Sequence, residues 1–472
     1  MPSDLRQIED RLRAAYADAA ETVRPEDISE RAPAATGAVR WRAWARTAGR
    51  RSTALAAAVA VLVIVITATV TPQVLQSGSR HRNGSQPAAH LPHSHMAYVL
   101  GGAPRDLLIP VNLATGAPLK PIHFGLRGGE TGIAISPDGS LVYVLTVRGQ
   151  LVPVDVSTGT AGQPIKVGGV SQELVTTPNG KGAYVLEPPY GVEAVDLATR
   201  TALGFIKVRG ADGFALTPNG KTLYVLGTNA STTISTTDLV LTAIDTATNA
   251  AVSTLTLTGP DLKPHLRGWH VMEESVTMAP DGKTVYVSYM AFNATTPLRA
   301  DAWIIPVKVA SGTELKPINV SRSGIQNFTI SPDSQGGYVS DAQSVTPIDL
   351  RTGTALRPIP LPSAHHSYPQ QSYALTFSPD GGTVYAVDES GSTVVPIDTA
   401  TNTAQQPIRL TGWPNWMLDD GVFAPGGKTL YVLSHANDMT NAVRMVPIDT
   451  ATGTAGKPID IPAGLGGIVF SP

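Results

Sequence analysis

The chain of 472 residues contains no cysteine. This excludes disulfide bonds, thiolate metal ligands, a cysteine nucleophile and a lipidated N-terminal cysteine, so an exported fold must be held by packing alone. Charge is scarce as well, since charged residues make up 15% and the formal net charge is -2. Without a basic field, or a Lys- and Arg-rich stripe interleaved with aromatic residues, no nucleic-acid partner is expected.

Motifs of common enzymes are missing too. The sequence has no H-E-x-x-H, no Gly-rich phosphate loop, no G-x-S-x-G elbow and no EF-hand loop. No catalytic residue and no cofactor is therefore predicted. His90, His93 and His95 have the chemistry to bind a metal ion through neutral imidazoles, but spare histidines in a flexible segment are the simpler interpretation, so no metal site is predicted.

Residues 52–71, STALAAAVAVLVIVITATVT, carry no charge. About 20 helical residues at 1.5 Å each span a hydrocarbon core of about 30 Å, which predicts one transmembrane helix. A buried helix of a soluble domain would show a polar face, and a cleaved signal peptide would have a shorter leader. Five arginines precede the segment and two follow it closely, which predicts a cytoplasmic N-terminus and an extracytoplasmic remainder: Arg40, Arg42, Arg46, Arg50 and Arg51 before, Arg80 and Arg82 after.

Two polar segments flank this span. The cytoplasmic segment, residues 1–51, begins with apolar residues three or four positions apart from Leu5 to Val23, which is typical of an amphipathic helix. Residues 72–95 are rich in Ser, Gly, His and Pro, and predict a flexible tether.

From residue 96 to residue 472 one pattern recurs. It consists of a short apolar strand, a tight turn, a Tyr-centred strand, a variable loop, a strand ending in Ile-Asp, a Thr-rich turn and a last strand; residues 134–167 are the best copy. The strand tyrosines are Tyr98, Tyr143, Tyr184, Tyr224, Tyr286, Tyr338, Tyr385 and Tyr431. Four strands repeating about every 40 to 45 residues are typical of propeller blades. The sequence predicts an all-β propeller of about eight four-stranded blades, with seven as the alternative.

The turns carry their own signals. The first turn of the units reads SPDG, TPNG, APDG, SPDS or APGG. Pro fixes the backbone angle φ at its own position, and Asp, Asn or Gly tolerates the backbone conformation that the next turn position requires. An Asp before the Thr-rich turn recurs in nearly every unit, so a structural bond to turn amides is expected rather than catalysis: Asp155, Asp196, Asp245, Asp349, Asp398 and Asp449. Pro-Ile pairs mark the last strand as the outer edge. The repeat pattern does not explain the prolines in the third strand, Pro153, Pro396 and Pro447.

SPDGKTVYV-like and VPIDTATGTAGKPI-like segments resemble the YVTN-type β-propeller repeat family over residues 96–472. The resemblance implies a radial array of four-stranded blades, often seven, frequently extracytoplasmic, and supplies no catalytic residues. The Ala- and Arg-rich cytoplasmic segment resembles leaders of actinobacterial membrane proteins. The chain ends, at residues 466–472, with the first strand and incipient turn of a ninth unit, whereas the first unit begins at its Tyr strand. We therefore expect the C-terminal strand to pair with residues 96–101 and close the ring.

The long irregular loops all follow the second or fourth strand of a unit, and so belong to one face of the propeller. They carry the candidate ligand-binding residues Trp269, His270, Tyr289, Phe292, His365, His366, Tyr368, Trp413 and Trp416. Aromatic anchors on variable loops are typical of binding sites, although such rings also cap the ends of blades.

Two functions remain open from the sequence. The first is a cell-surface module, anchored by residues 52–71, that binds or scaffolds a protein, peptide or glycan. The alternative is an exported enzyme, such as a lactonase or other hydrolase. Convergent His, Asp and Glu residues at the centre would favour the enzyme, and exposed aromatics without strongly shifted carboxylates would favour the binder.

Overall fold

The computed structural model describes residues 95–102, 107–124, 130–169, 173–228, 239–260, 262, 269–293, 299–321, 324–361, 373–389, 392–410, 416–436, 443–462 and 464–472. The predicted cytoplasmic segment, the predicted transmembrane helix and the tether up to residue 94 lie outside these ranges. Among the residues that are described, no helix has the length and apolar character needed to cross a membrane.

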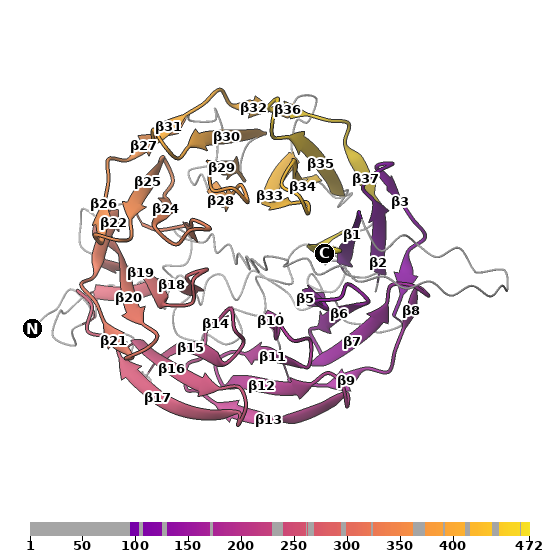
Figure 1. Ribbon diagram of the computed structural model, residues 1–472, viewed down its shortest axis with the longest axis horizontal. Helices are drawn as coiled ribbons and strands as arrows, with labels where there is room; N and C mark the ends of the chain where they lie inside the picture. The colour runs from indigo at the N-terminus through magenta and orange to yellow at the C-terminus, as the bar shows by residue number, and fades with distance from the viewer. Residues whose placement is uncertain are drawn as a thin grey trace, which may run out of the picture. The chain divides into compact units, whose positions relative to one another are not determined.

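Eight antiparallel sheets surround a common axis as the blades of a propeller (Figure 1). Blades are numbered here in chain order. Blade 1 holds β38 (Gly464–Phe470), β1 (Met96–Gly102), β2 (Leu107–Asn112), β3 (Ala117–Pro118) and β4 (Ile122–His123). Blade 2 holds β5 (Glu130–Ile135), β6 (Leu141–Thr146), β7 (Gln150–Asp155), β8 (Thr160–Ala161) and β9 (Ile165–Lys166). Blade 3 holds β10 (Glu173–Thr176), β11 (Gly182–Glu187), β12 (Gly191–Asp196) and β13 (Thr201–Lys207). Blade 4 holds β14 (Gly213–Leu216), β15 (Thr222–Thr228), β16 (Leu239–Asp245) and β17 (Ala250–Thr256).

The remaining four blades follow the same order. Blade 5 holds β18 (Trp269–Met278), β19 (Thr284–Asn293), β20 (Arg299–Lys308), β21 (Thr313–Glu314) and β22 (Ile318–Ser321). Blade 6 holds β23 (Asn327–Ile330), β24 (Gly336–Ser340), β25 (Ser344–Asp349), β26 (Thr354–Ala355) and β27 (Ile359–Pro360). Blade 7 holds β28 (Tyr373–Phe377), β29 (Thr383–Asp388), β30 (Thr393–Asp398), β31 (Thr403–Ala404) and β32 (Ile408–Arg409). Blade 8 holds β33 (Trp416–Phe423), β34 (Thr429–Ala436), β35 (Val443–Asp449), β36 (Thr454–Ala455) and β37 (Ile459–Ile461). The predicted count of eight blades is confirmed.

The core lies between the blades. The second strand of a blade is buried along most of its length, as in β6 with the sequence LVYVLT. Because neighbouring blades cover both of its faces, the strand is apolar almost throughout instead of alternating. Four aromatic pairs join consecutive blades, Tyr286–Phe328, Tyr338–Phe377, Tyr385–Phe423 and Tyr431–Phe470, with ring centroids 5.6 to 5.8 Å apart.

The repeated turn carboxylates are structural, as predicted. In blade 2, Asp138 accepts hydrogen bonds from the Ser136 hydroxyl at 2.6 Å and the Ser140 amide at 3.0 Å. Asp155 accepts hydrogen bonds from the amides of Ser157 and Thr158 at 2.9 and 3.0 Å. These bonds favour the ionised form, and the Ser157 hydroxyl contributes most to the lowered pKa of Asp155.

The third-strand prolines now have a physical account. Six blades place proline opposite the strand tyrosine, as in the Tyr143–Pro153 pair, and all six have an outer strand broken into two short pieces. The Pro153 carbonyl accepts a bond from the Gly162 amide at 2.7 Å, so the side of Pro153 that lacks an N–H faces the break in the outer strand. Blades 3 and 4 have Ala194 and Ala243 instead, and their outer strands β13 and β17 are unbroken.

The predicted closure of the ring is also confirmed. Strand β38 pairs with β1 from Phe470–Ala97 to Gly464–Gly102. Beyond the ladder, the Met96 amide donates to the Ser471 hydroxyl at 3.0 Å, and the Ser471 amide donates to the Met96 carbonyl at 2.9 Å. The last residue, Pro472, lies against Gly139, where other blades place the proline of the preceding turn against the turn glycine.

Candidate functional site

The propeller has two different faces. We call the turn face the one that carries the turns after the first and third strands, such as Ser136–Gly139 and Asp155–Gly159. We call the loop face the opposite one, where second strands end and first and third strands begin. The chain enters β1 at the turn face, because His95 precedes Met96 and its carbonyl accepts a bond from the Leu113 amide at 2.9 Å.

Among the described strands, those of two blades extend further on the loop face than those of the others. In blade 5, β19 continues to Asn293, seven residues beyond Tyr286, whereas β6 of blade 2 ends at Thr146, three residues beyond Tyr143. Four additional residues correspond to about 13 Å of strand. Blade 8 extends in the same direction to a lesser degree, with β34 ending at Ala436. Residues 269–272, 289–293 and 416–418, which were expected in loops, are therefore paired strand.

Some candidate residues lie at the ends of these strands. In blade 5, Trp269 pairs with Asn293 and His270 pairs with Phe292. In blade 8, Trp416 pairs with Ala436. Trp269, His270 and Phe292 thus share the tip of one hairpin, and Trp416 lies on another blade. His365, His366, Tyr368 and Trp413 lie outside the described residues.

Tyr289 has a different place from the one expected. Its ring is fully buried between blades 4 and 5 in a cluster with Leu262 and Ile305. Its hydroxyl donates to the carbonyl of Pro260 at 2.5 Å, which holds the connection between the two blades. Tyr289 was predicted as a ligand-binding residue on a loop, but β19 continues through this position and directs the side chain into the core.

Two acids at the loop-face ends of the inner strands, the buried Glu173 and the solvent-exposed Asp212, were not found from the sequence. Glu173 begins β10 in blade 3, and Asp212 directly precedes β14 in blade 4. Burial, with a smaller contribution from the Asp212 carboxylate, raises the pKa of Glu173 to about 8. Desolvation also raises the pKa of Asp212. Glu173 therefore favours its protonated form at neutral pH, chiefly because burial disfavours its charged form.

A second acidic pair lies between blades 2 and 3. Glu187, at the end of β11, is buried, and its Oε1 atom has no hydrogen-bond partner among the described residues. Its carboxylate lies against Gly168, where any side chain would collide with it. Burial and the nearby Glu187 raise the pKa of Glu193. Asn327, at the start of β23 in blade 6, likewise has a buried Oδ1 atom without a partner in the described part.

Blade 8 contributes a histidine–carboxylate pair next to the position of Trp416. His435 Nδ1 lies 3.0 Å from an Asp419 carboxylate oxygen. Burial, the largest single effect, lowers the pKa of His435, but the hydrogen bond to Asp419 and the charge of that carboxylate together outweigh it, so the net pKa is raised. No group of three or more His, Asp or Glu residues in the described ranges is arranged to hold a metal ion.

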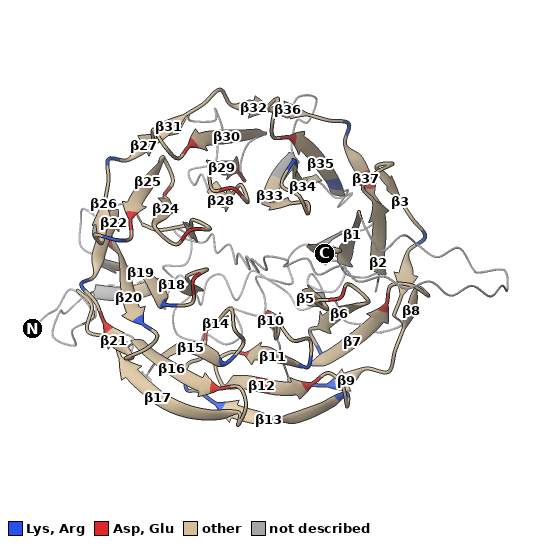
Figure 2. Ribbon diagram, viewed as in Figure 1, with Lys and Arg blue, Asp and Glu red and all other residues tan. Residues whose placement is uncertain are grey.

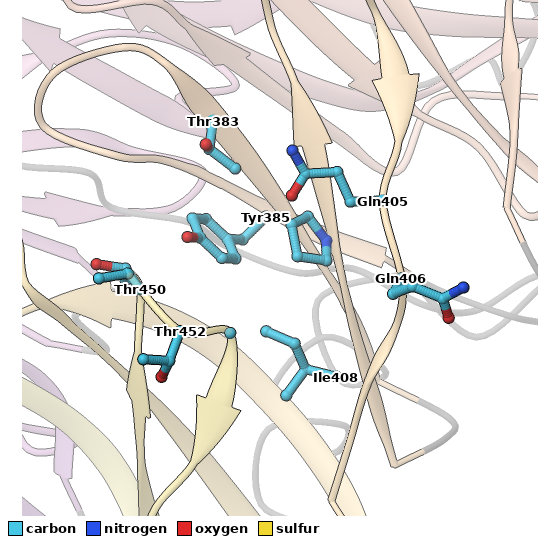
Figure 3. Close-up of a pocket in the computed structure, with 10 residues that line it drawn as sticks. Thr383, Tyr385, Gln405, Gln406, Ile408, Thr450 and Thr452 are labelled. Atoms are coloured by element: carbon cyan, nitrogen blue, oxygen red, sulfur yellow. The ribbon is translucent and has the colours of Figure 1, made fainter.

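A cavity of about 400 Å³ opens between blades 7 and 8, on the turn face (Figure 3). Tyr385, Gln405 and Ile408 line it from blade 7, and Thr450 and Thr452 from blade 8. In two other blade pairs the tyrosine hydroxyl is occupied, because Tyr184 contacts Asn249 Oδ1 at 2.7 Å and Tyr338 contacts Asn402 Oδ1 at 2.6 Å. The corresponding turn residue beside Tyr385 is Gly453, which has no side chain to reach the tyrosine hydroxyl.

Glu173 and Asp212 had one usable signal in the sequence. Aligning the units on their Pro-containing turns places Glu173 four residues before Thr177 and Asp212 five residues before Thr217, where other units have Asn327 or Tyr373. Each acid occurs once, however, and a search for repeated motifs passes over positions that differ between units.

Comparisons with known proteins identify the fold but no family. No protein-family model matches the chain, and no curated protein matches it. Among solved structures, the chain is similar to dihydro-heme d1 dehydrogenase NirN in complex with DHE, with a TM-score of 0.62 and 13% identity over 82% of this chain and 78% of that one. Kuenenia stuttgartiensis hydrazine synthase matches with a TM-score of 0.44 and 17% identity over 65% of this chain and 90% of that one. At these identities the first likeness shows the propeller fold alone.

Proposed function

We propose that the chain is a membrane-anchored, extracytoplasmic module whose loop face binds or scaffolds a protein, peptide or glycan. The observation that carries this proposal is that the described strands of blades 5 and 8 extend beyond those of the other blades on that face. Paired strands hold the ends of such an extension more rigidly than free loops would, which lowers the entropic cost of binding. Trp269 and Phe292 at the tip of blade 5 are residue types that supply binding energy in interfaces.

The proposed anchor is consistent with the direction of this face. Residues 52–71 are the proposed transmembrane helix, and the chain enters the propeller at the turn face through His95. A tether of about 24 residues that behaves as a coil reaches roughly 25 to 30 Å. The turn face is then nearer the membrane, and the loop face points away from it toward a partner outside the cell.

Photo-crosslinking in intact cells tests the face. A photoreactive residue would replace Trp269 or Trp416 in the full chain, and matched controls would replace the exposed turn-face residues Lys181 and Lys221. We expect the same partner to be captured from both loop-face positions and from neither control position. The triple change of Trp269, Trp413 and Trp416 to Ala should then weaken binding of that partner at least about tenfold, with an unchanged melting midpoint. Equal capture from both faces would refute the assignment.

An exported hydrolase is the second candidate, and the Glu173–Asp212 pair is the observation that favours it. A carboxylic acid with a pKa of about 8 beside a second carboxylate has the properties of a general acid. The test is hydrolysis of a panel of lactones and esters by the full chain and by Glu173→Gln. Activity that disappears in the variant while substrate binding remains supports the enzyme, and a wild-type chain without activity on the panel removes it in favour of the binding module.

A further inference from the structure

The outer edges of blades 3 and 4 differ from those of the other six blades. In the six, the outer strand is two short pieces separated by a Pro-containing break, which leaves no continuous row of free backbone groups. Strands β13 and β17 instead run unbroken for seven residues each, contain no proline and pair on one side only. An unbroken exposed edge is a template for another strand, and breaks and prolines are the usual protection against it. Blades 3 and 4 lack those breaks and prolines, and each of their outer strands has one bulged residue, Leu203 in β13 and Val252 in β17.

The charges distinguish the two edges. Strand β17, AAVSTLT, has no charged residue, and it is uniformly tan in Figure 2. It is exposed along nearly its whole length, and Val252 is 63% exposed. Strand β13 ends at Lys207 and directly follows Arg200. Antiparallel pairing of β13 with itself would bring Lys207 of one copy toward Arg200 of the other, whereas self-pairing of β17 opposes no charges.

We propose that β17 pairs antiparallel with β17 of a second copy of this chain, so that blade 4 continues across a two-fold axis. An antiparallel pair of identical strands is related by a two-fold axis perpendicular to the sheet. Figure 1 shows β17 running along the rim of the propeller, so that axis is roughly parallel to the propeller axis. The two propellers then lie side by side with their turn faces on the same side, an arrangement that two chains anchored in one membrane require.

The absence of cysteine gives a direct test with single substitutions. Ser253 is the central residue of β17, so a two-fold axis there places Ser253 opposite its own copy. Directly opposed residues in an antiparallel pair have Cα atoms about 4.5 to 5.5 Å apart, within the range of a disulfide. Under a mild oxidant, the full chain with Ser253→Cys should form a covalent dimer at least about tenfold faster than Leu203→Cys, which places cysteine on the exposed edge of β13. Equal rates overturn the proposal.

A second pair of variants measures the association itself. Leu203 and Val252 occupy equivalent bulge positions in blades 3 and 4 and are both exposed. We expect the full chain in detergent to be dimeric in analytical ultracentrifugation, Val252→Lys to raise its dissociation constant at least about tenfold, and Leu203→Lys to leave it unchanged. Melting midpoints verify that both variants fold. A monomeric wild-type chain, or equal effects of the two lysines, overturns the proposal and leaves the edge of β17 open to a strand from a different protein.

Discussion

Removal of residues 464–472 deletes β38, the strand that closes the ring. The deletion uncovers β1, in which Met96, Tyr98 and Leu100 are fully buried. It also removes the six residue pairs between β38 and β1 and the hydrogen bonds between Ser471 and Met96. Blade 1 would then lack its inner strand, and the packing of β38 against β5 of blade 2 would be lost.

The magnitude follows from what is lost. Ile468, Val469 and Phe470 are half-buried, which gives roughly 1 kcal/mol each from apolar burial. The hydrogen bonds of Ser471 contribute about 2 kcal/mol together. A loss of about 5 kcal/mol is comparable to the whole stability of a small domain, and we expect the thermal midpoint to fall by about 5 to 10 °C.

Differential scanning calorimetry of the full chain measures the midpoint, and relocation of the strand provides the control. Inserting residues 464–472 followed by Asp-Gly directly before His95 of the truncated chain recreates an SPDG turn ahead of β1. We expect that variant to regain most of the lost midpoint. An unchanged midpoint after truncation, or a relocated strand that restores nothing, would show that the pairing of β38 with β1 contributes little to stability.

Three further predictions concern the pKa of Glu173, the Tyr338–Asn402 hydrogen bond and the His435–Asp419 pair. Because burial raises the pKa of Glu173 from 4.5 to about 8, the stability tied to its protonated form is complete below pH 4.5 and is lost as the pH rises through about 8; denaturant titrations should show a wild-type chain that weakens from pH 5 to 9 and a Glu173→Gln variant that does so less. A double-mutant cycle of Tyr338→Phe and Asn402→Gly should give a coupling energy of about 1 kcal/mol, and no coupling would exclude a stabilising hydrogen bond between them. The imidazole of His435 should titrate above pH 6.5 by NMR, and Asp419→Asn should lower that midpoint, which would not move if the pair were broken in solution.

Local repeated signals account for what the sequence predicted well. The Pro-containing turns, the Asp residues before the Thr-rich turns and the strand tyrosines recur with little change, so each unit predicts the same four strands. The incomplete units at the two ends predicted the pairing of residues 466–472 with residues 96–101. In each case the chemistry is complete within one unit, and neighbouring units repeat it.

Residues that occur once were harder to place. The segment that begins at Trp269 and the segment that ends at Phe292 have no counterpart in the sequence pattern of the other units. Their irregular composition was interpreted as two loops, although the segments pair with each other. The burial of Tyr289 depends on Pro260 and Ile305, which come from other parts of the chain. The raised pKa of Glu173 likewise requires blade 4 to cover blade 3, a contact that no periodicity within one unit reveals.

The pairing of β1 also determines how the propeller withstands a pull. A force applied through the chain ahead of His95 acts along β1, which has β2 on one side and β38 on the other. The force runs parallel to both ladders, so their hydrogen bonds are loaded in shear and must yield together, whereas a hairpin pulled from its open end yields one bond at a time. A pull on the chain ahead of His95 is therefore resisted by two ladders at once.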